Sequence, residues 1–214
     1  MKNVLIGLIA VGALIAGALI AVNLSQPKET QYAKLYPQGR QLSDVNLTDQ
    51  HGATINTEWF ANKWTLTFVG YTFCPDICPT TLAELKSIYP QLSGIDSEFP
   101  IQVLFLSVDP NRDTVPRLKE YVDFFNPEFA AATAEHKYLF PVVRSMGMMY
   151  SITDSTDNPN YLVDHSASVV IINPKAQVVG RFVPIHEPGQ IAISDGTQIL
   201  TDMPVIIDNY RKAS

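Results

Sequence analysis

Two predominantly hydrophobic runs, Trp64 to Phe73 and Ile101 to Asp109, flank a segment whose apolar residues follow a helical spacing. Both runs are rich in β-branched and aromatic residues, which is typical of strands buried on both faces. Between them, Leu82, Leu85 and Ile88 recur at the intervals of one helix face. Strand, helix and strand in this order predict a right-handed parallel crossover, the unit from which α/β sheets are built.

The remaining sequence adds further elements to this unit. Residues 43–60 alternate in polarity around a Gly-containing turn and predict an N-terminal β-hairpin. The other expected elements are a first helix that stops at Pro90, helices at Thr114–Phe125 and about Val142–Tyr150, a hairpin of strands at Ser168–Asn173 and Val178–Val183, and a final helix at about Gly196–Tyr210 that Pro204 interrupts. We therefore expect one α/β domain over residues 43–214.

The start of the chain predicts a membrane anchor. Residues Val4 to Val22 carry no charge or strongly polar group, and roughly 20 such residues span a bilayer. A cleaved signal peptide is the alternative, but its apolar region is shorter and ends at a small-x-small site, and the stretch VNLSQPK at the end of this run offers no good Ala-x-Ala site. We expect an uncleaved transmembrane helix within residues 1–24 and a polar tether at 25–42. Lys2 favours a cytoplasmic N-terminus, which places the domain on the periplasmic or an equivalent outer face of the cell inner membrane.

The charge balance excludes one class of partner. The chain has 21 acidic and 15 basic residues, a net charge of −6, and no cluster of Lys or Arg. Nucleic acid is therefore not an expected partner.

Both cysteines of the chain, Cys74 and Cys78, lie where the first hydrophobic run meets the first helix, and a proline follows each. A disulfide staple, a redox couple and a metal clamp are the alternatives. A staple across so small a loop adds little stability. A helix N-terminus favours thiolates, so we expect a lowered pKa at Cys78. Thiolates select Cu(I) or zinc, but a structural zinc site needs four ligands.

A third soft ligand would come from one of four histidines. His51 lies in a solvated turn, and His136 precedes a helical segment. His186 lies in a proline-rich loop. His165 directly precedes the buried strand at 168–173 and can face the thiol loop, which makes it the preferred candidate, with His186 next.

Three segments in order, Phe68–Leu82 (FVGYTFCPDICPTTL), Leu106–Thr114 (LSVDPNRDT) and Asp164–Ser168 (DHSAS), resemble the Sco/SenC family. The resemblance implies a thioredoxin-like fold, in a peroxiredoxin-like variant with an N-terminal β-hairpin, behind one transmembrane helix. It also implies copper binding by Cys74, Cys78 and His165, with the two cysteines able to act as a redox-active dithiol.

The same resemblance implies a function. Members help to assemble the copper centre of cytochrome c oxidase, so the expected partner is its copper-containing subunit or another cuproprotein. The family's acidic cluster near the metal makes Asp76, Asp109 and Asp113 candidates for a role there. A metallochaperone is the leading hypothesis. The second hypothesis is an enzyme, a thiol–disulfide reductase. A peroxidase is less favoured, because it would need one activated cysteine with peroxide-binding donors.

Overall fold

The computed structural model describes residues 7, 11–17, 27–152, 156, 158 and 160–213. The expected anchor, Val4–Val22, lies mostly outside these residues. In the described part of the chain, no helix combines the length and hydropathy needed to cross a membrane. The chain divides into two compact units, residues 1–29 with 205–214 and residues 30–204. In the first unit, Lys28 and Asn209 exchange two hydrogen bonds, at 2.9 and 2.8 Å; the sheet and the candidate site belong to the second.

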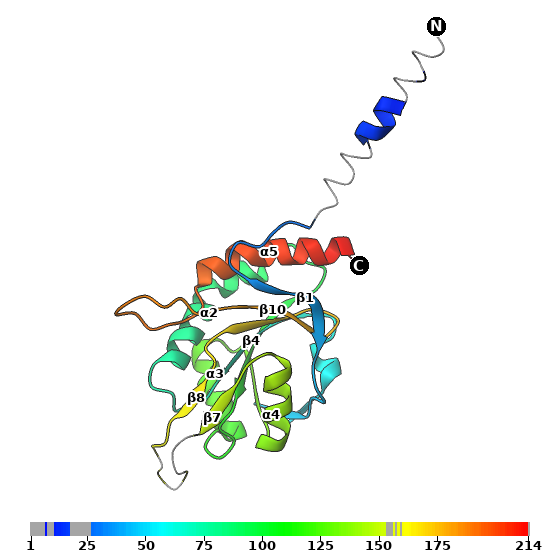
Figure 1. The fold of residues 1–214 in the computed structure, drawn as a ribbon. Coiled ribbons are helices and arrows are strands. Elements are labelled where there is room, and N and C mark those ends of the chain that lie inside the picture. Colours follow the sequence, from blue (N-terminus) through cyan, green and yellow to red (C-terminus); the bar gives the residue numbers. More distant parts are fainter. Residues whose placement is uncertain are drawn as a thin grey trace. The chain divides into compact units, whose positions relative to one another are not determined.

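A mixed sheet of eight strands, in the order β1-β10-β9-β4-β5-β6-β2-β3, organises the second unit (Figure 1). A separate antiparallel pair, β7 and β8, lies outside this sheet. The strands are β1 Lys34–Gln41, β2 Leu47–Asp49, β3 Thr54–Ile55, β4 Trp64–Gly70, β5 Ile101–Ser107, β6 Ala130–Thr133, β7 Tyr150–Ile152, β8 Val163–His165, β9 Val169–Ile172 and β10 Gln177–Phe182.

Helices connect the parallel strands. From residue 27 onward, the helices are the 3-10 turn Thr57–Phe60, α2 Ile77–Ser93, α3 Val115–Phe125, α4 His136–Ser145 and α5 Gly196–Ala213. Helix α2 joins β4 to β5 and α3 joins β5 to β6, and both strand pairs are parallel. The two helices therefore pack beside each other (Figure 1).

The predicted crossover is confirmed. Strand β4 pairs with β5 in parallel from Trp64 opposite Ile101 to Gly70 opposite Ser107, while β9 pairs antiparallel with its other edge. All seven residues of β4 are buried, which explains the continuous hydrophobic run. This strand delivers the chain directly into the cysteine loop.

Both predicted hairpins are also confirmed. Strands β2 and β3 pair antiparallel, with Leu47 opposite Ile55. Strands β9 and β10 pair antiparallel around a turn in which Ala176 has a positive φ of 56°.

Two predicted helix boundaries are wrong, and Pro204 does not interrupt the final helix, which runs from Gly196 to Ala213. Helix α2 continues through Pro90 to Ser93, because a proline in the last turn removes only one hydrogen bond and the completely buried Leu92 keeps that turn packed. Helix α4 occupies His136–Ser145 rather than 142–150 and contains Pro141. Its buried positions, among them Leu139 and Val143, show that packing outweighs the proline's helix-breaking tendency here.

Four strands, β1, β6, β7 and β8, were not expected. Strands β7 and β8 have three residues each, which is too few to show an alternating pattern. Strand β1 lies inside residues 25–42, which we expected to be a tether, and pairs antiparallel with β10. It is an edge strand with mostly exposed side chains, so it has no hydrophobic alternation to reveal it. Strand β6 consists largely of alanine, a residue depleted in strands; Ala131 and Ala132 are nevertheless fully buried.

Candidate metal centre

Cys74 lies in the loop that connects β4 to α2. Its backbone N–H donates to the carbonyl oxygen of Tyr71 at 3.2 Å, which folds the chain back just after the strand. The thiol is free and partly exposed. Cys74 is therefore the sulfur that a reaction partner can reach.

Cys78 is the second residue of α2, whose N-cap is Asp76, so it lies in the first turn of the helix. Its side chain is completely buried against the end of β4. A Cβ atom at Gly70 would lie only 2.5 Å from the Cys78 Sγ atom and 3.0 Å from the ring of Phe105. The glycine at position 70 thus provides the space that the buried sulfur occupies.

His165 is the last residue of β8 and pairs with Tyr150 of β7. The rings of Phe68 and Tyr71 each contact the imidazole edge-on, with centroids 5.9 Å away. Its Nδ1 atom lies 3.3 Å from the carbonyl oxygen of Ser166. Since a carbonyl oxygen can only accept, Nδ1 carries the proton and the Nε2 lone pair is left for another partner. That Nε2 atom lies 3.4 Å from the Cys78 Sγ atom.

These three side chains form a compact set of donor atoms. The two sulfurs and one imidazole nitrogen all lie within 4.8 Å of one another, although 87 positions separate Cys78 from His165. Thiolate sulfur and imidazole nitrogen suit soft or borderline ions such as copper, and Nδ1 donating to a carbonyl is the usual support of a metal-ligating histidine. The residues present therefore fit a copper ion.

The surroundings of the two thiols shift their pKa values in opposite directions. Hydrogen bonding from Cys78, with smaller contributions from the nearby His165 and from backbone groups of the loop, lowers the pKa of Cys74 to about 3 against the opposing effect of burial. Burial, followed by the proximity of Cys74, raises the pKa of Cys78 far above its usual value. The expectation that Cys78 has the lowered pKa is thus wrong, because desolvation outweighs the helix N-terminus.

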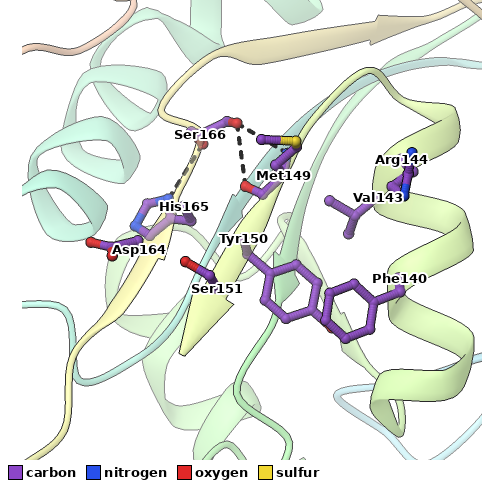
Figure 2. Close-up of a pocket in the computed structure, with 9 residues that line it drawn as sticks. All are labelled: Phe140, Val143, Arg144, Met149, Tyr150, Ser151, Asp164, His165 and Ser166. Atoms are coloured by element: carbon purple, nitrogen blue, oxygen red, sulfur yellow. Dashed lines mark hydrogen bonds between the residues drawn. The ribbon is translucent and has the colours of Figure 1, made fainter. Parts of the chain in front are cut away.

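A cavity of about 380 Å³ adjoins His165 on the side of α4 (Figure 2). Phe140 and Tyr150 stack in its wall with ring centroids 4.5 Å apart. Met149 contributes a side chain that is 72% exposed. The imidazole is therefore bordered by open space as well as by the thiols.

The other histidines lie elsewhere. His51 is exposed in the turn between β2 and β3. The Nδ1 atom of His136 lies 2.9 Å from the Tyr150 hydroxyl, and His186 is exposed in the loop after β10. Of the three expected acidic residues, Asp76 is exposed, whereas Asp109 and Asp113 are completely or almost completely buried. Sequence reasoning did not single out Tyr161 and Arg112, which contact Asp109.

A mixed α/β, thioredoxin-like fold that carries two thiols and an imidazole at the end of its central strand defines a class of thiol-based metal and redox proteins. The family model described as SCO1/SenC matches residues 36–198. The chain therefore belongs to the SCO1/SenC family.

Individual relatives agree with this assignment. A "putative copper-binding protein" of Stutzerimonas stutzeri is 31% identical over 83% of this chain and 82% of its own length. The mitochondrial SCO2 homolog of Bos taurus is 32% identical over 77% of this chain but only 63% of its own length, so the chain spans less than two thirds of that relative. The crystal structure of Arabidopsis thaliana ScoI with copper bound superposes with a TM-score of 0.66 at 28% identity, covering 80% of this chain and 98% of that one.

Proposed function

We propose that this chain is a copper metallochaperone that binds Cu(I) and Cu(II) through Cys74, Cys78 and His165. The observation that carries the proposal is the set of two sulfurs and one nitrogen within 4.8 Å. Two thiolates satisfy Cu(I), and the imidazole adds the nitrogen that Cu(II) prefers. The partly exposed Cys74 gives an acceptor protein access to the bound ion.

The proposed recipient is the copper-containing subunit of cytochrome c oxidase or another cuproprotein. Family membership supports this assignment. In the same way, we propose an N-terminal anchor at residues 1–24, with the copper-binding domain on the outer face of the cell inner membrane.

Copper titration of the full-length protein in detergent, with thiols held reduced, tests the proposal. Wild type should bind one copper ion per chain, and Cys74→Ser and Cys78→Ser should each lose most of the affinity because two thiolates hold Cu(I). Ser93→Ala is a suitable control, because Ser93 is exposed at the far end of α2. Copper binding of wild-type strength in both cysteine variants would refute the assignment.

A thiol–disulfide reductase is a second candidate, supported by the division between the thiols. An exposed thiol of low pKa attacks a disulfide, and a buried neighbour then resolves the mixed disulfide. Cys74 and Cys78 have these properties. Reduction of a disulfide-containing partner domain by stoichiometric reduced protein tests it, and Cys78→Ser should stop at the mixed disulfide with Cys74. Failure to trap that species would count against the reductase.

A further inference from the structure

We propose that Tyr161, Asp109 and Arg112, here called the Tyr161 anchor, position His165 against the two thiols. The proposal deepens the copper function proposed above and rests on it. Tyr161 lies in the segment that joins β7 to β8, four residues before His165, and is only 2% exposed. The segment therefore has one firmly buried aromatic side chain just before the strand that delivers the imidazole.

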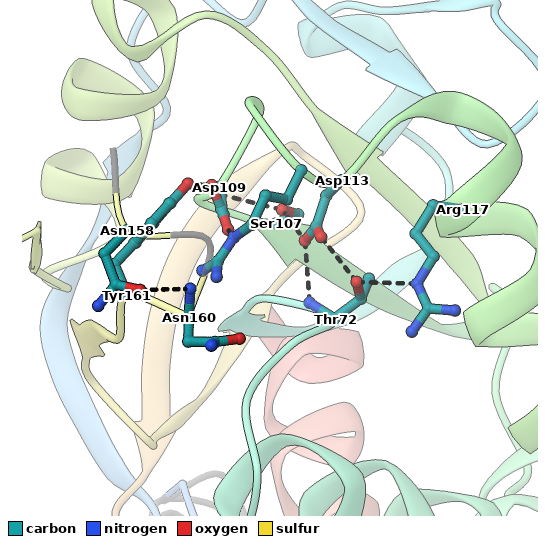
Figure 3. Close-up of polar contacts among 9 residues, drawn as sticks. Thr72, Ser107, Asp109, Asp113, Arg117, Asn158, Asn160 and Tyr161 are labelled. Atoms are coloured by element: carbon teal, nitrogen blue, oxygen red, sulfur yellow. Dashed lines mark hydrogen bonds and ion pairs between the residues drawn. The ribbon is translucent and has the colours of Figure 1, made fainter. Parts of the chain in front are cut away.

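The carboxylate of Asp109 is the fixed point of this anchor (Figure 3). Its Oδ1 atom accepts a hydrogen bond from the hydroxyl of Tyr161. Its Oδ2 atom accepts from the Nε of Arg112 at 2.5 Å. Since Asp109 is completely buried, both bonds are made to a charged group away from water, where such bonds are strongest.

Arg112 extends the anchor to the thiol loop. Its guanidinium carbon lies 3.5 Å from the centre of the Tyr161 ring, and also 4.9 Å from that of Phe73 and 5.6 Å from that of Tyr71. Phe73 directly precedes Cys74, and Tyr71 contacts the imidazole of His165. One planar cation thus contacts the loop that carries a thiol and the segment that leads into β8, the strand of His165.

A second carboxylate holds the thiol loop independently. Asp113 accepts from the backbone N–H and the hydroxyl of Thr72 at 2.9 and 2.7 Å, and from the Ser107 hydroxyl at 2.5 Å. Asp109 and Asp113 both lie in the connection between β5 and α3. This short connection therefore holds both halves of the candidate centre, one through each carboxylate (Figure 3).

The His165 side depends more on such an anchor than the thiol side does. Strand β8 has three residues and, within the described part of the chain, pairs only with β7, outside the main sheet. Cys78, by contrast, is held in a helix against the end of the buried β4. Loosening the anchor should therefore displace the imidazole and leave the thiols in place. Because two thiolates suffice for Cu(I), the effect should fall on Cu(II).

The test compares full-length Tyr161→Phe with Tyr121→Phe. The first variant removes the hydroxyl bonded to Asp109. The control removes a buried hydroxyl that has no hydrogen-bond partner within the described residues. We expect about tenfold weaker Cu(II) affinity in Tyr161→Phe, as for other supporting partners of metal ligands, together with a changed Cu(II) electron paramagnetic resonance spectrum. Cu(I) affinity should stay at the wild-type value, and Tyr121→Phe should match wild type throughout.

A metal-free measurement separates this proposal from the copper function. In the copper-free protein, Tyr161→Phe should speed amide hydrogen exchange at residues 160–166 and leave residues 77–82 unchanged. Wild-type protein that binds no copper would refute the copper function, and unchanged exchange in Tyr161→Phe would refute the anchor. Faster exchange with an unchanged Cu(II) spectrum would also refute it, since the role would then be local stability alone. If Tyr161→Phe fails to fold, Arg112→Lys, which keeps the charge but loses the planar contacts, must give the same changes.

Discussion

The two sulfurs of the candidate centre differ in exposure and in proton affinity. Cys74 is partly exposed with a pKa lowered to about 3, chiefly by the hydrogen bond from Cys78, while Cys78 is completely buried with a raised pKa. Since the thiolate is the nucleophile, Cys74 should carry the reactivity of the pair.

Alkylation of the reduced, copper-free protein checks this difference. At a pH below the pKa of an ordinary cysteine, each increase of one pH unit raises the thiolate fraction, and with it the reaction rate, roughly tenfold. Because its lowered pKa keeps Cys74 ionised, its rate with iodoacetamide should be nearly constant from about pH 5 to 8. Mass spectrometry of the digested protein should place the label on Cys74 first. Preferential labelling of Cys78, or a steep rise of the rate with pH, would contradict the prediction.

His165 distinguishes copper binding from dithiol chemistry, because a reductase needs the sulfurs but no third soft ligand. His165→Ala should weaken Cu(II) binding by at least the roughly 10–100-fold typical of a lost supporting residue, with a smaller effect on Cu(I). Disulfide exchange by the thiols should continue. His51→Ala is the matched control, because His51 is exposed in a turn.

Copper titration and a disulfide-exchange assay on the same preparations give the comparison. An unchanged Cu(II) affinity in His165→Ala would remove this residue from the site. A loss on changing His186 instead would move the ligand to the loop after β10.

At the scale of elements, the site depends on the close approach of the end of β4 to the first turn of α2. Gly70→Ala would place a Cβ atom 2.5 Å from the Cys78 Sγ atom, and a buried contact this short forces atoms to move. We expect a free energy of unfolding lower by about 1–3 kcal/mol, as for other overpacked cores, together with weaker copper binding.

Gly94→Ala provides the control for this change. Its Cβ atom would lie no closer than 3.4 Å to its nearest neighbour, the carbonyl oxygen of Pro90. Chemical denaturation of the three proteins should show loss of stability in Gly70→Ala alone. Equal stability of Gly70→Ala and wild type would mean that the Cys78 sulfur moves without cost.

The sequence predicted those elements whose own hydrophobic residues show, by their spacing, which side chains are buried. Strand β4 is buried along its whole length and forms a continuous hydrophobic run, and the cysteine loop follows it directly. Helix α4 and strand β1 were missed in whole or in part because neighbouring elements stabilise them: β10 supplies the hydrogen bonds of β1, and packing compensates for Pro141 in α4.

The same distinction applies within the site. The cysteines and His165 could be found because their types and positions carry chemistry. Tyr161 is a lone aromatic residue in a polar loop, and its partner Asp109 is 52 positions away. Only the folded chain brings them together, so their relation has no local signal in the sequence.

At the scale of the whole molecule, copper binding and disulfide formation compete for the same two sulfurs. A disulfide between Cys74 and Cys78 would remove both thiolates from the donor set. The redox state of the compartment that holds the domain would then decide which activity is available, and that compartment depends on the N-terminal segment.

Residues Val4–Val22 should keep the mature protein in the membrane, because the run is long enough to span the bilayer and the stretch at its end, VNLSQPK, offers no Ala-x-Ala cleavage site. Membrane fractionation of expressing cells, followed by N-terminal sequencing, measures this. The protein should remain with the membranes after a high-salt wash and keep its first residues. Leu14→Arg is a demanding control, since a charge near the centre of a spanning helix costs about 2.5–3.5 kcal/mol and should release part of the protein. A mature N-terminus near Ser25 in the soluble fraction would show instead that the segment is a cleaved signal peptide.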